Sequence, residues 1–130
     1  MMDVGVGTAG VASMAVTSAD TAIAVGSGDV PVLATPRVIA LMEQATCEAL
    51  RGSLADSRTS VGTEVNVSHR VPTPVGSKVT ARAIVESIED RVIRFTVSAA
   101  HQTASGEQVA EVAIGTITRV VVERERFGTS

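Results

Sequence analysis

Residues 35–52 read TPRVIALMEQATCEALRG, and this stretch decides the fold because it holds the one convincing helical pattern in the chain. Thr35 is predicted as the N-cap, and Pro36 suits the first helical position, where a missing N–H costs nothing. Gly52 is predicted to stop the helix. Apolar side chains at three- and four-residue spacing predict one amphipathic helix over about 36–50: Val38, Leu41, Met42, Ala45 and Ala49.

After this helix the pattern changes to period two, which is typical of strands. Further strands are predicted over about 76–88, 91–101 and 109–124, with a hairpin turn at Glu89 and Asp90. Before the helix, 13–16 and 22–25 are predicted as two short strands. Alternate residues of the first strand after the helix are predicted to share one face: Val61, Thr63, Val65, Val67 and His69.

Two short strands, one helix and four consecutive antiparallel strands predict an α+β domain. A single helix with an apolar stripe needs a sheet to bury that stripe, and a meander of long strands would wrap around it. This is the hot-dog arrangement. Such a sheet has exposed edges, and hot-dog domains commonly pair two sheets edge to edge. We therefore expect a homodimer or a dimer of dimers.

Composition limits the class of protein further. Of the 130 residues, 45% are hydrophobic, so we expect one domain over 11–127 after a loose Gly-rich segment over 1–10. A net charge of −3 and only two aromatic residues argue against a nucleic-acid partner. The single cysteine, Cys47, excludes an internal disulfide and a multi-cysteine metal site. We expect a cytoplasmic protein with no membrane span.

Few side chains can carry chemistry, and no phosphate-binding loop, HExxH or CxxC motif occurs. Glu43 lies in the most apolar part of the predicted helix. Its carboxylate is either solvated at the edge of the apolar stripe or placed in a pocket. His69 and His101 each end a predicted strand on its apolar face, so parity cannot choose between them. Each of these residues, taken singly, has a purely structural explanation, as Thr35 has in capping the helix.

Seven short motifs follow one another between residues 30 and 127: LAT at 33–35, ALME at 40–43, SVGT at 60–63, VSH at 67–69, TPVG at 73–76, GTITR at 115–119 and ERF at 125–127. In this order and spacing the chain resembles the hot-dog thioesterases of the fluoroacetyl-CoA thioesterase family. The resemblance implies hydrolysis of a small or medium acyl-CoA, with coenzyme A present only as part of the substrate. It implies a catalytic set of Thr35, Glu43 and His69.

Thioester hydrolysis needs a base or nucleophile, a donor for the developing oxyanion and a proton for the thiolate. Glu43 would act as nucleophile or general base, and His69 would move the proton. The Gly62 amide is a candidate for the oxyanion, and Arg119 for the phosphates of coenzyme A at the rim. Eight residues along a regular helix rise ~12 Å. Thr35 and Glu43 therefore reach one thioester only if Thr35 leaves the helix or one of them comes from a partner chain.

Three further considerations concern the substrate and the alternative functions. Family members that select fluoroacetyl-CoA have a longer, aromatic-rich lid before the Thr, whereas 26–33 is short and has no Phe, so the acyl group stays open. A hot-dog hydratase or dehydratase typically pairs Asp with His near the helix start, and no Asp occurs between Asp29 and Asp56. A non-catalytic acyl-CoA-binding dimer would keep the fold without needing the catalytic set.

Overall fold

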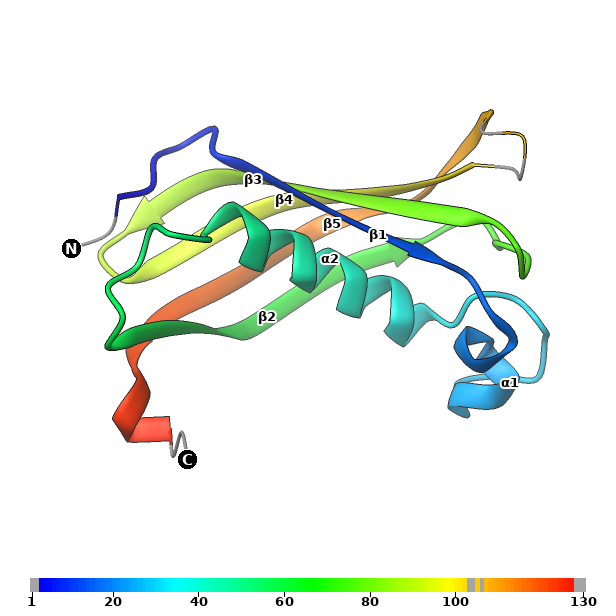
Figure 1. The fold of residues 1–130 in the computed structure, drawn as a ribbon, viewed down its shortest axis with the longest axis horizontal. Helices are drawn as coiled ribbons and strands as arrows, with labels where there is room; N and C mark the ends of the chain where they lie inside the picture. The colour runs from blue at the N-terminus through cyan, green and yellow to red at the C-terminus, as the bar shows by residue number, and fades with distance from the viewer. Residues whose placement is uncertain (1–2, 103–104, 106, 128–130) are drawn as a thin grey trace.

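The computed structural model describes residues 3–102, 105 and 107–127. Met1 and Met2, which belong to the segment expected to be loose, lie outside these residues. The elements follow the chain in this order (Figure 1): strand β1 (Ala9–Ala15), 3-10 turn η1 (Ser18–Asp20), helix α1 (Ala22–Val25), helix α2 (Thr35–Ala49), strands β2 (Arg58–His69), β3 (Lys78–Glu89), β4 (Val92–Gln102) and β5 (Gln108–Glu123), and 3-10 turn η2 (Arg124–Phe127).

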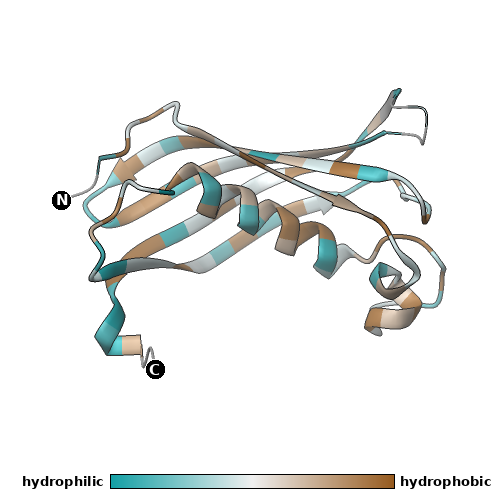
Figure 2. Cartoon of the chain, viewed as in Figure 1, coloured by the Kyte–Doolittle hydropathy of each residue, from teal (hydrophilic) through white to brown (hydrophobic). Residues whose placement is uncertain are grey.

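The five strands form one antiparallel sheet in the order β1-β3-β4-β5-β2, and α2 lies along one face of it (Figure 1). This is the α+β hot-dog arrangement that the sequence predicts. Hydrophobic and hydrophilic residues alternate along the strands behind α2 (Figure 2), as a sheet with one buried face requires. The largest fully buried side chains come from both layers and from the segment before α2: Phe95, Leu33, Met42, Ile93 and Ile117.

The N-terminal part of the chain differs from the expectation. β1 begins at Ala9, inside the segment expected to be loose, and Gly7 donates a backbone hydrogen bond to the Val85 carbonyl (2.9 Å). Gly10 lies directly against α2, where a Cβ atom would collide with the backbone of Ala45 and Ala49. This glycine therefore lets β1 approach α2 closely. A Gly-rich composition alone does not show whether a glycine has this packing role or belongs to an irregular segment.

Residues 22–25 form the short helix α1, so the strand predicted there is wrong. The Thr21 hydroxyl caps this helix by accepting from the Ala24 N–H (3.2 Å), and Gly26 ends it with a φ of 87°. Four residues are too few to show a periodicity, so capping decides the conformation. The hairpin turn predicted at Glu89 and Asp90 is present but lies one residue later, at Asp90 and Arg91, because Glu89 still pairs with Val92; Asp90 has a φ of 56°.

A β-bulge at Thr63 changes which face of β2 each side chain occupies. Gly62 pairs with Arg119 and Glu64 with Thr118, so the strand register skips Thr63, whose hydroxyl donates to the Thr118 carbonyl (3.4 Å). Before the bulge Gly62 faces α2, and after it Val65, Val67 and His69 lie on that face. The prediction that Val61 shares the face of His69 is therefore wrong, because the extra residue inverts the alternation.

Candidate active site

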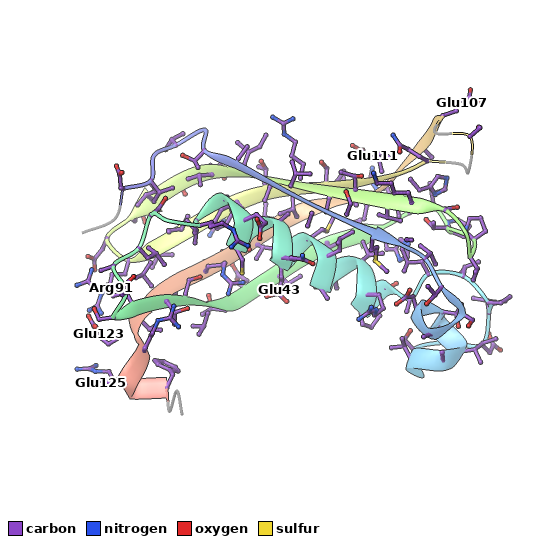
Figure 3. The ribbon with its side chains drawn as sticks, viewed as in Figure 1. Glu43, Arg91, Glu107, Glu111, Glu123 and Glu125 are labelled. Atoms are coloured by element: carbon purple, nitrogen blue, oxygen red, sulfur yellow. The ribbon has the colours of Figure 1, made fainter. Side chains whose placement is uncertain are left out.

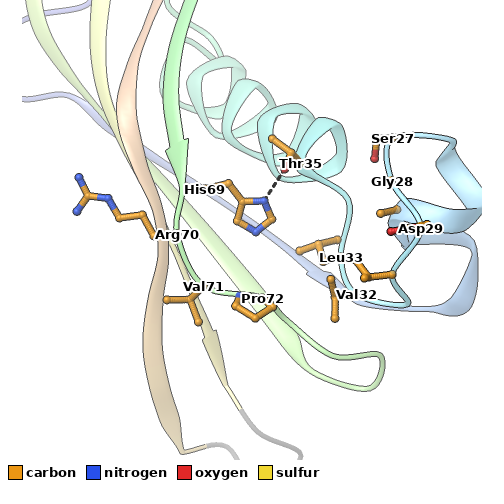
Figure 4. A pocket seen from close by; sticks show the side chains of 12 residues that line it. Ser27, Gly28, Asp29, Val32, Leu33, Thr35, His69, Arg70, Val71 and Pro72 are labelled. Atoms are coloured by element: carbon orange, nitrogen blue, oxygen red, sulfur yellow. Dashed lines mark hydrogen bonds between the residues drawn. The ribbon is translucent and has the colours of Figure 1, made fainter.

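Thr35 and His69 meet where α2 begins and β2 ends. The Thr35 hydroxyl oxygen lies 2.7 Å from Nδ1 of His69 (Figure 4). Thr35 is the first residue of α2, and the N-cap position belongs to Ala34, which has no side-chain cap. The prediction of Thr35 as N-cap is therefore wrong. Its hydroxyl turns to the histidine because β2 brings His69 to the helix start, a contact that no local pattern encodes.

The His69 ring is half-buried, and its second nitrogen, Nε2, is buried without a hydrogen-bond partner among the described residues. Burial lowers the pKa of His69 from its ordinary value of 6.5, and the backbone of Val71 opposes this shift only in part. The ring is therefore neutral at pH 7. A neutral imidazole has one donor and one acceptor nitrogen, so His69 can accept a proton through one and give one through the other.

An open cleft of about 330 Å³ lies beside this pair, between 22–33 on one side and 69–72 on the other. Thr35 and His69 both line it. Figure 4 shows the second ring nitrogen of His69 on the side of Val32 and Pro72, away from Thr35. The His69 ring thus lies at the wall of a space that a small molecule can enter, with Nε2 itself buried on the side of Val32 and Pro72.

Glu43 belongs to a second cluster, halfway along α2 on the side of β2 (Figure 3). Its carboxylate oxygen Oε2 lies 3.4 Å from Nη1 of Arg119, whose guanidinium also donates to the Ser60 hydroxyl (2.8 Å) and the Ser60 carbonyl (3.0 Å). The Arg119 side chain is 9% exposed and that of Glu43 is 37% exposed. Glu43 is thus neither freely solvated nor enclosed, because Arg119 contacts its carboxylate while part of the side chain stays exposed to solvent.

Gly62 packs against this carboxylate. A Cβ atom at residue 62 would lie 2.5 Å from the Glu43 oxygen, so the carboxylate keeps this position only beside a glycine. Arg119, which the sequence suggested for phosphates at the rim, is instead buried, with its donors directed to Ser60 and Glu43. A charged side chain is rarely buried unless it is paired, and here the partner is Glu43.

The structure brings the candidate residues together in two groups. Thr35 and His69 form one, and Glu43, Gly62 and Arg119 form the other. Thr35 and Glu43 stand on the same regular helix, so the rise of ~12 Å between their backbones applies. Thr35 does not leave the helix, which removes one of the two ways in which both could act on one thioester.

The sequence profile of the fluoroacetyl-CoA-specific thioesterases (FlK) matches residues 16–125, which is most of the chain. The chain belongs to this family. It is 35% identical over 96 residues to the fluoroacetyl-CoA thioesterase of Streptantibioticus cattleyicolor, a match over 74% of this chain and 65% of that protein's length. The chain thus spans slightly less than two thirds of that relative.

Two solved structures agree with this membership of the FlK family. A crystal structure of an FlK variant matches with a TM-score of 0.84 at 28% identity, over 98% of this chain and 94% of that chain. A hot-dog-like protein from Thermanaerovibrio acidaminovorans matches with a TM-score of 0.79 at 26% identity, over 98% and 96% of the two chains. The resemblance seen in the seven motifs and the hot-dog fold are both confirmed.

The structure of this FlK-family member also shows polar residues near the site that sequence reasoning missed. Asp20 is buried, accepts from the backbone N–H and hydroxyl of Thr17 (2.8 and 2.9 Å), and receives Nε and Nη2 of Arg37 (3.0 and 2.7 Å). The Ala34 N–H donates to the Asp20 carbonyl (2.9 Å), so Asp20 ties down the start of α2. The Thr-x-x-Asp spacing at 17–20 is the signal that could have predicted this cap.

His101, the second histidine, is part of the structural core. Its Nδ1 lies 2.9 Å from the hydroxyl of Thr73, and both residues are buried. His101 does not line the cleft next to Thr35. The structure thereby separates two histidines that strand parity could not separate.

Among the described residues, no three His, Cys, Asp or Glu side chains gather as they would around a metal ion. Within the same residues, no helix is both long and apolar enough to cross a membrane.

Proposed function

We propose that this protein hydrolyses an acyl-CoA thioester to the free acid and coenzyme A. The observation that carries the proposal is the hydrogen bond between Thr35 and a neutral His69 at the wall of an open cleft. Membership of a thioesterase family supports it. The single cysteine, Cys47, is free and exposed, which fits a reducing compartment such as the cytoplasm.

The two groups of residues supply what the reaction needs. Glu43 is the carboxylate that attacks the thioester carbonyl or takes a proton from the attacking water, and Arg119 holds it in place. Water provides the new oxygen of the acid, and the carbon–sulfur bond breaks. Thr35 and His69 orient the thioester and pass a proton to the departing thiolate. The amide of Gly62, beside Glu43, is the donor for the oxyanion.

A second copy of the chain would join the two groups. β2 is an edge strand of the sheet and carries Gly62 near one end and His69 at the other. Along one strand these two residues are separated by ~20 Å. We propose that the β2 strands of two chains pair antiparallel, so that each composite site takes Thr35 and His69 from one chain and Glu43 and Gly62 from the other.

The bulge makes this pairing geometrically consistent. A two-fold axis through Asn66 sets Val65 opposite Val67 of the other copy, and Glu64 opposite Ser68. Because Thr63 is skipped, as it is in the pairing with β5, Gly62 then stands opposite His69. Both face the helix side of the joined sheet. Without the bulge, Gly62 and His69 would point to opposite faces.

The hydrolysis proposal is tested by measuring free thiol release from a panel of acyl-CoAs with the unaltered protein and with Glu43→Gln. Loss of the base or nucleophile is expected to lower kcat by about a hundredfold or more. Glu86→Gln is the matched control, because Glu86 is an exposed acid on β3, an inner strand outside the proposed seam. Near-normal turnover by Glu43→Gln would exclude its role. Binding of acyl-CoA without thiol release would favour the non-catalytic dimer.

The shared site is tested by complementation. Thr35→Ala and Glu43→Ala proteins, each inactive alone, are mixed under conditions that exchange subunits. In a mixed dimer with composite sites, one of the two sites has all of its residues intact. Half of the dimers are mixed, so activity should return to about a quarter of the normal level. A mixture that stays inactive, or a monomer that turns over, would refute the shared site.

A further inference from the structure

The cleft beside Thr35 and His69 has walls of aliphatic side chains. They come from two segments of the chain: Ala22, Val30, Val32 and Leu33 on one side, and Val71 and Pro72 on the other. The two walls are fastened to each other by backbone contacts, since the Leu33 N–H donates to the Thr73 carbonyl (2.9 Å) and Val32 bridges Pro74. The cleft is therefore preformed, with a reactive end at His69 and an aliphatic remainder.

The charges of the cleft select against an anionic ligand tail. Asp29 is among the lining residues and stands across the cleft from His69 (Figure 4). The guanidinium of Arg70, the one basic side chain among the lining residues, points away from His69 and the cleft in the same view. A carboxylate at the end of an acyl chain would thus lie near an acid and near no cation. No new interaction would compensate for the loss of its hydrating water.

The size of the cleft limits the chain length. Its volume of about 330 Å³ lies at the lower end of the roughly 300–1,000 Å³ of ligand clefts. A two-carbon acyl group at His69 would leave most of the aliphatic wall in contact with water. A chain of a few more carbons would cover the partly exposed Val32 and Val71, and a long fatty chain would extend beyond the walls.

We infer that the acyl group hydrolysed by this protein is an uncharged aliphatic chain of about four to six carbons, with its carbonyl at Thr35 and His69 and its tail along Val32 and Val71. This inference rests on the proposed thioesterase function. It adds the substrate class, which belongs to this chain's own cleft and not to its family.

The test compares acetyl-, butyryl-, hexanoyl-, decanoyl- and succinyl-CoA. Burial of each methylene favours binding by up to about fourfold. Because the cleft is open and buries each methylene only partly, kcat/KM should rise at least tenfold from acetyl to hexanoyl, with no further rise to decanoyl. Succinyl-CoA should be slower than butyryl-CoA, which has the same chain length. A flat or falling series from acetyl to hexanoyl, with thiol release intact, would overturn the inference and leave the proposed function standing.

A variant that narrows the cleft makes the test specific. Val32→Phe places a ring between the aliphatic walls and should reduce the hexanoyl-to-acetyl ratio of kcat/KM at least fivefold. Val11→Phe adds the same volume at an exposed position on β1, outside the cleft, and should keep the ratio. An equal fall of the ratio in both variants would contradict the placement of the acyl chain.

Binding separates the two proposals if turnover is absent. S-ethyl-CoA and S-hexyl-CoA are thioethers that cannot be hydrolysed, and their Kd values are measured by calorimetry. At least tenfold tighter binding of S-hexyl-CoA without thiol release from any thioester would refute hydrolysis while supporting an aliphatic ligand in the cleft. Equal Kd values would refute the inference whether or not the protein hydrolyses thioesters.

Discussion

The hydroxyl oxygen of Thr35 lies 2.7 Å from Nδ1 of His69, and this contact joins the first residue of α2 to the last residue of β2. When the hydroxyl donates to Nδ1, the proton of the neutral ring is on Nε2, the buried nitrogen without a partner among the described residues. One hydrogen bond thus sets both the orientation of the threonine oxygen and the tautomer of the histidine. It leaves the other ring nitrogen on the side of Val32 and Pro72, two residues that line the cleft.

The pH dependence of hydrolysis should report the environment of His69. Because burial lowers the pKa of His69 below 6.5, the active neutral form persists as the pH falls through 6.5 and is lost only at a lower pH. The acid limb of kcat/KM, measured over pH 4–8, should therefore have its midpoint below 6.5. A midpoint above 6.5 that shifts on mutation of His69 would show that the ring is not buried in the working enzyme.

The two histidines should differ in what their removal affects. His69→Ala should lower kcat by about a hundredfold or more, because the ring contacts the reacting groups. His101→Ala should keep kcat but destabilise the fold by about 1–3 kcal/mol, because it leaves the buried Thr73 hydroxyl unpaired. Thiol release and urea unfolding separate the two effects. Loss of kcat in folded His101→Ala, with normal turnover by His69→Ala, would transfer the role to His101.

Gly62→Ala should impair catalysis more than stability. The added methyl group would stand 2.5 Å from the Glu43 oxygen, so the carboxylate must move away from Arg119. We expect kcat to fall at least tenfold in thiol release assays, while the urea midpoint shifts little. Gly5→Ala is the matched control, because no atom lies within 4 Å of the added group there and φ is not positive. Normal kcat in Gly62→Ala would show that Glu43 works from another position.

The Asp20 carboxylate should stabilise the fold in a pH-dependent way. The backbone N–H of Thr17 is the main cause that lowers the pKa of Asp20 below 3.8, and the Arg37 guanidinium adds to it. A lowered pKa means that this stabilisation is complete above 3.8 and is lost as the pH falls through the lower folded-state value.

Asp20→Asn should therefore reduce the free energy of unfolding by about 1–3 kcal/mol at pH 6. The difference from the unaltered protein, measured by urea unfolding, should shrink below pH 3.8. Glu48→Gln, which removes the acid on α2 that pairs with the exposed Arg51, should have a smaller effect. A difference that stays constant down to pH 2 would contradict the role of the ionised carboxylate.

The protein should not prefer fluoroacetyl-CoA strongly over acetyl-CoA. The residues that line the cleft include no Phe, Tyr or Trp, so no aromatic side chain covers a small fluorinated group. The two kcat/KM values, measured side by side, should agree within about tenfold. A preference of a thousandfold would need about 4 kcal/mol of discrimination, which the aliphatic walls described here do not supply.

The sequence by itself determined the elements whose signals are local. The apolar stripe from Val38 to Ala49 predicted α2, and period-two alternation predicted four strands within a few residues of β2, β3, β4 and β5. Such patterns are readable because a helix or a half-buried strand repeats its environment every few residues. The order and spacing of seven motifs indicated the family in the same way, since they require no knowledge of contacts.

Only the tertiary structure decided which residues meet. The bulge at Thr63, the approach of β1 at Gly10 and the pairing of Arg119 with Glu43 each depend on a neighbour distant in the chain. Thr35 shows the reason most directly. From the local pattern, the Thr35 hydroxyl is expected to bond to the free N–H groups at the start of its own helix. In the folded protein, the sheet places Nδ1 of His69 2.7 Å from this hydroxyl. A hydrogen bond goes to the partner that the fold brings near, and that partner lies 34 residues away.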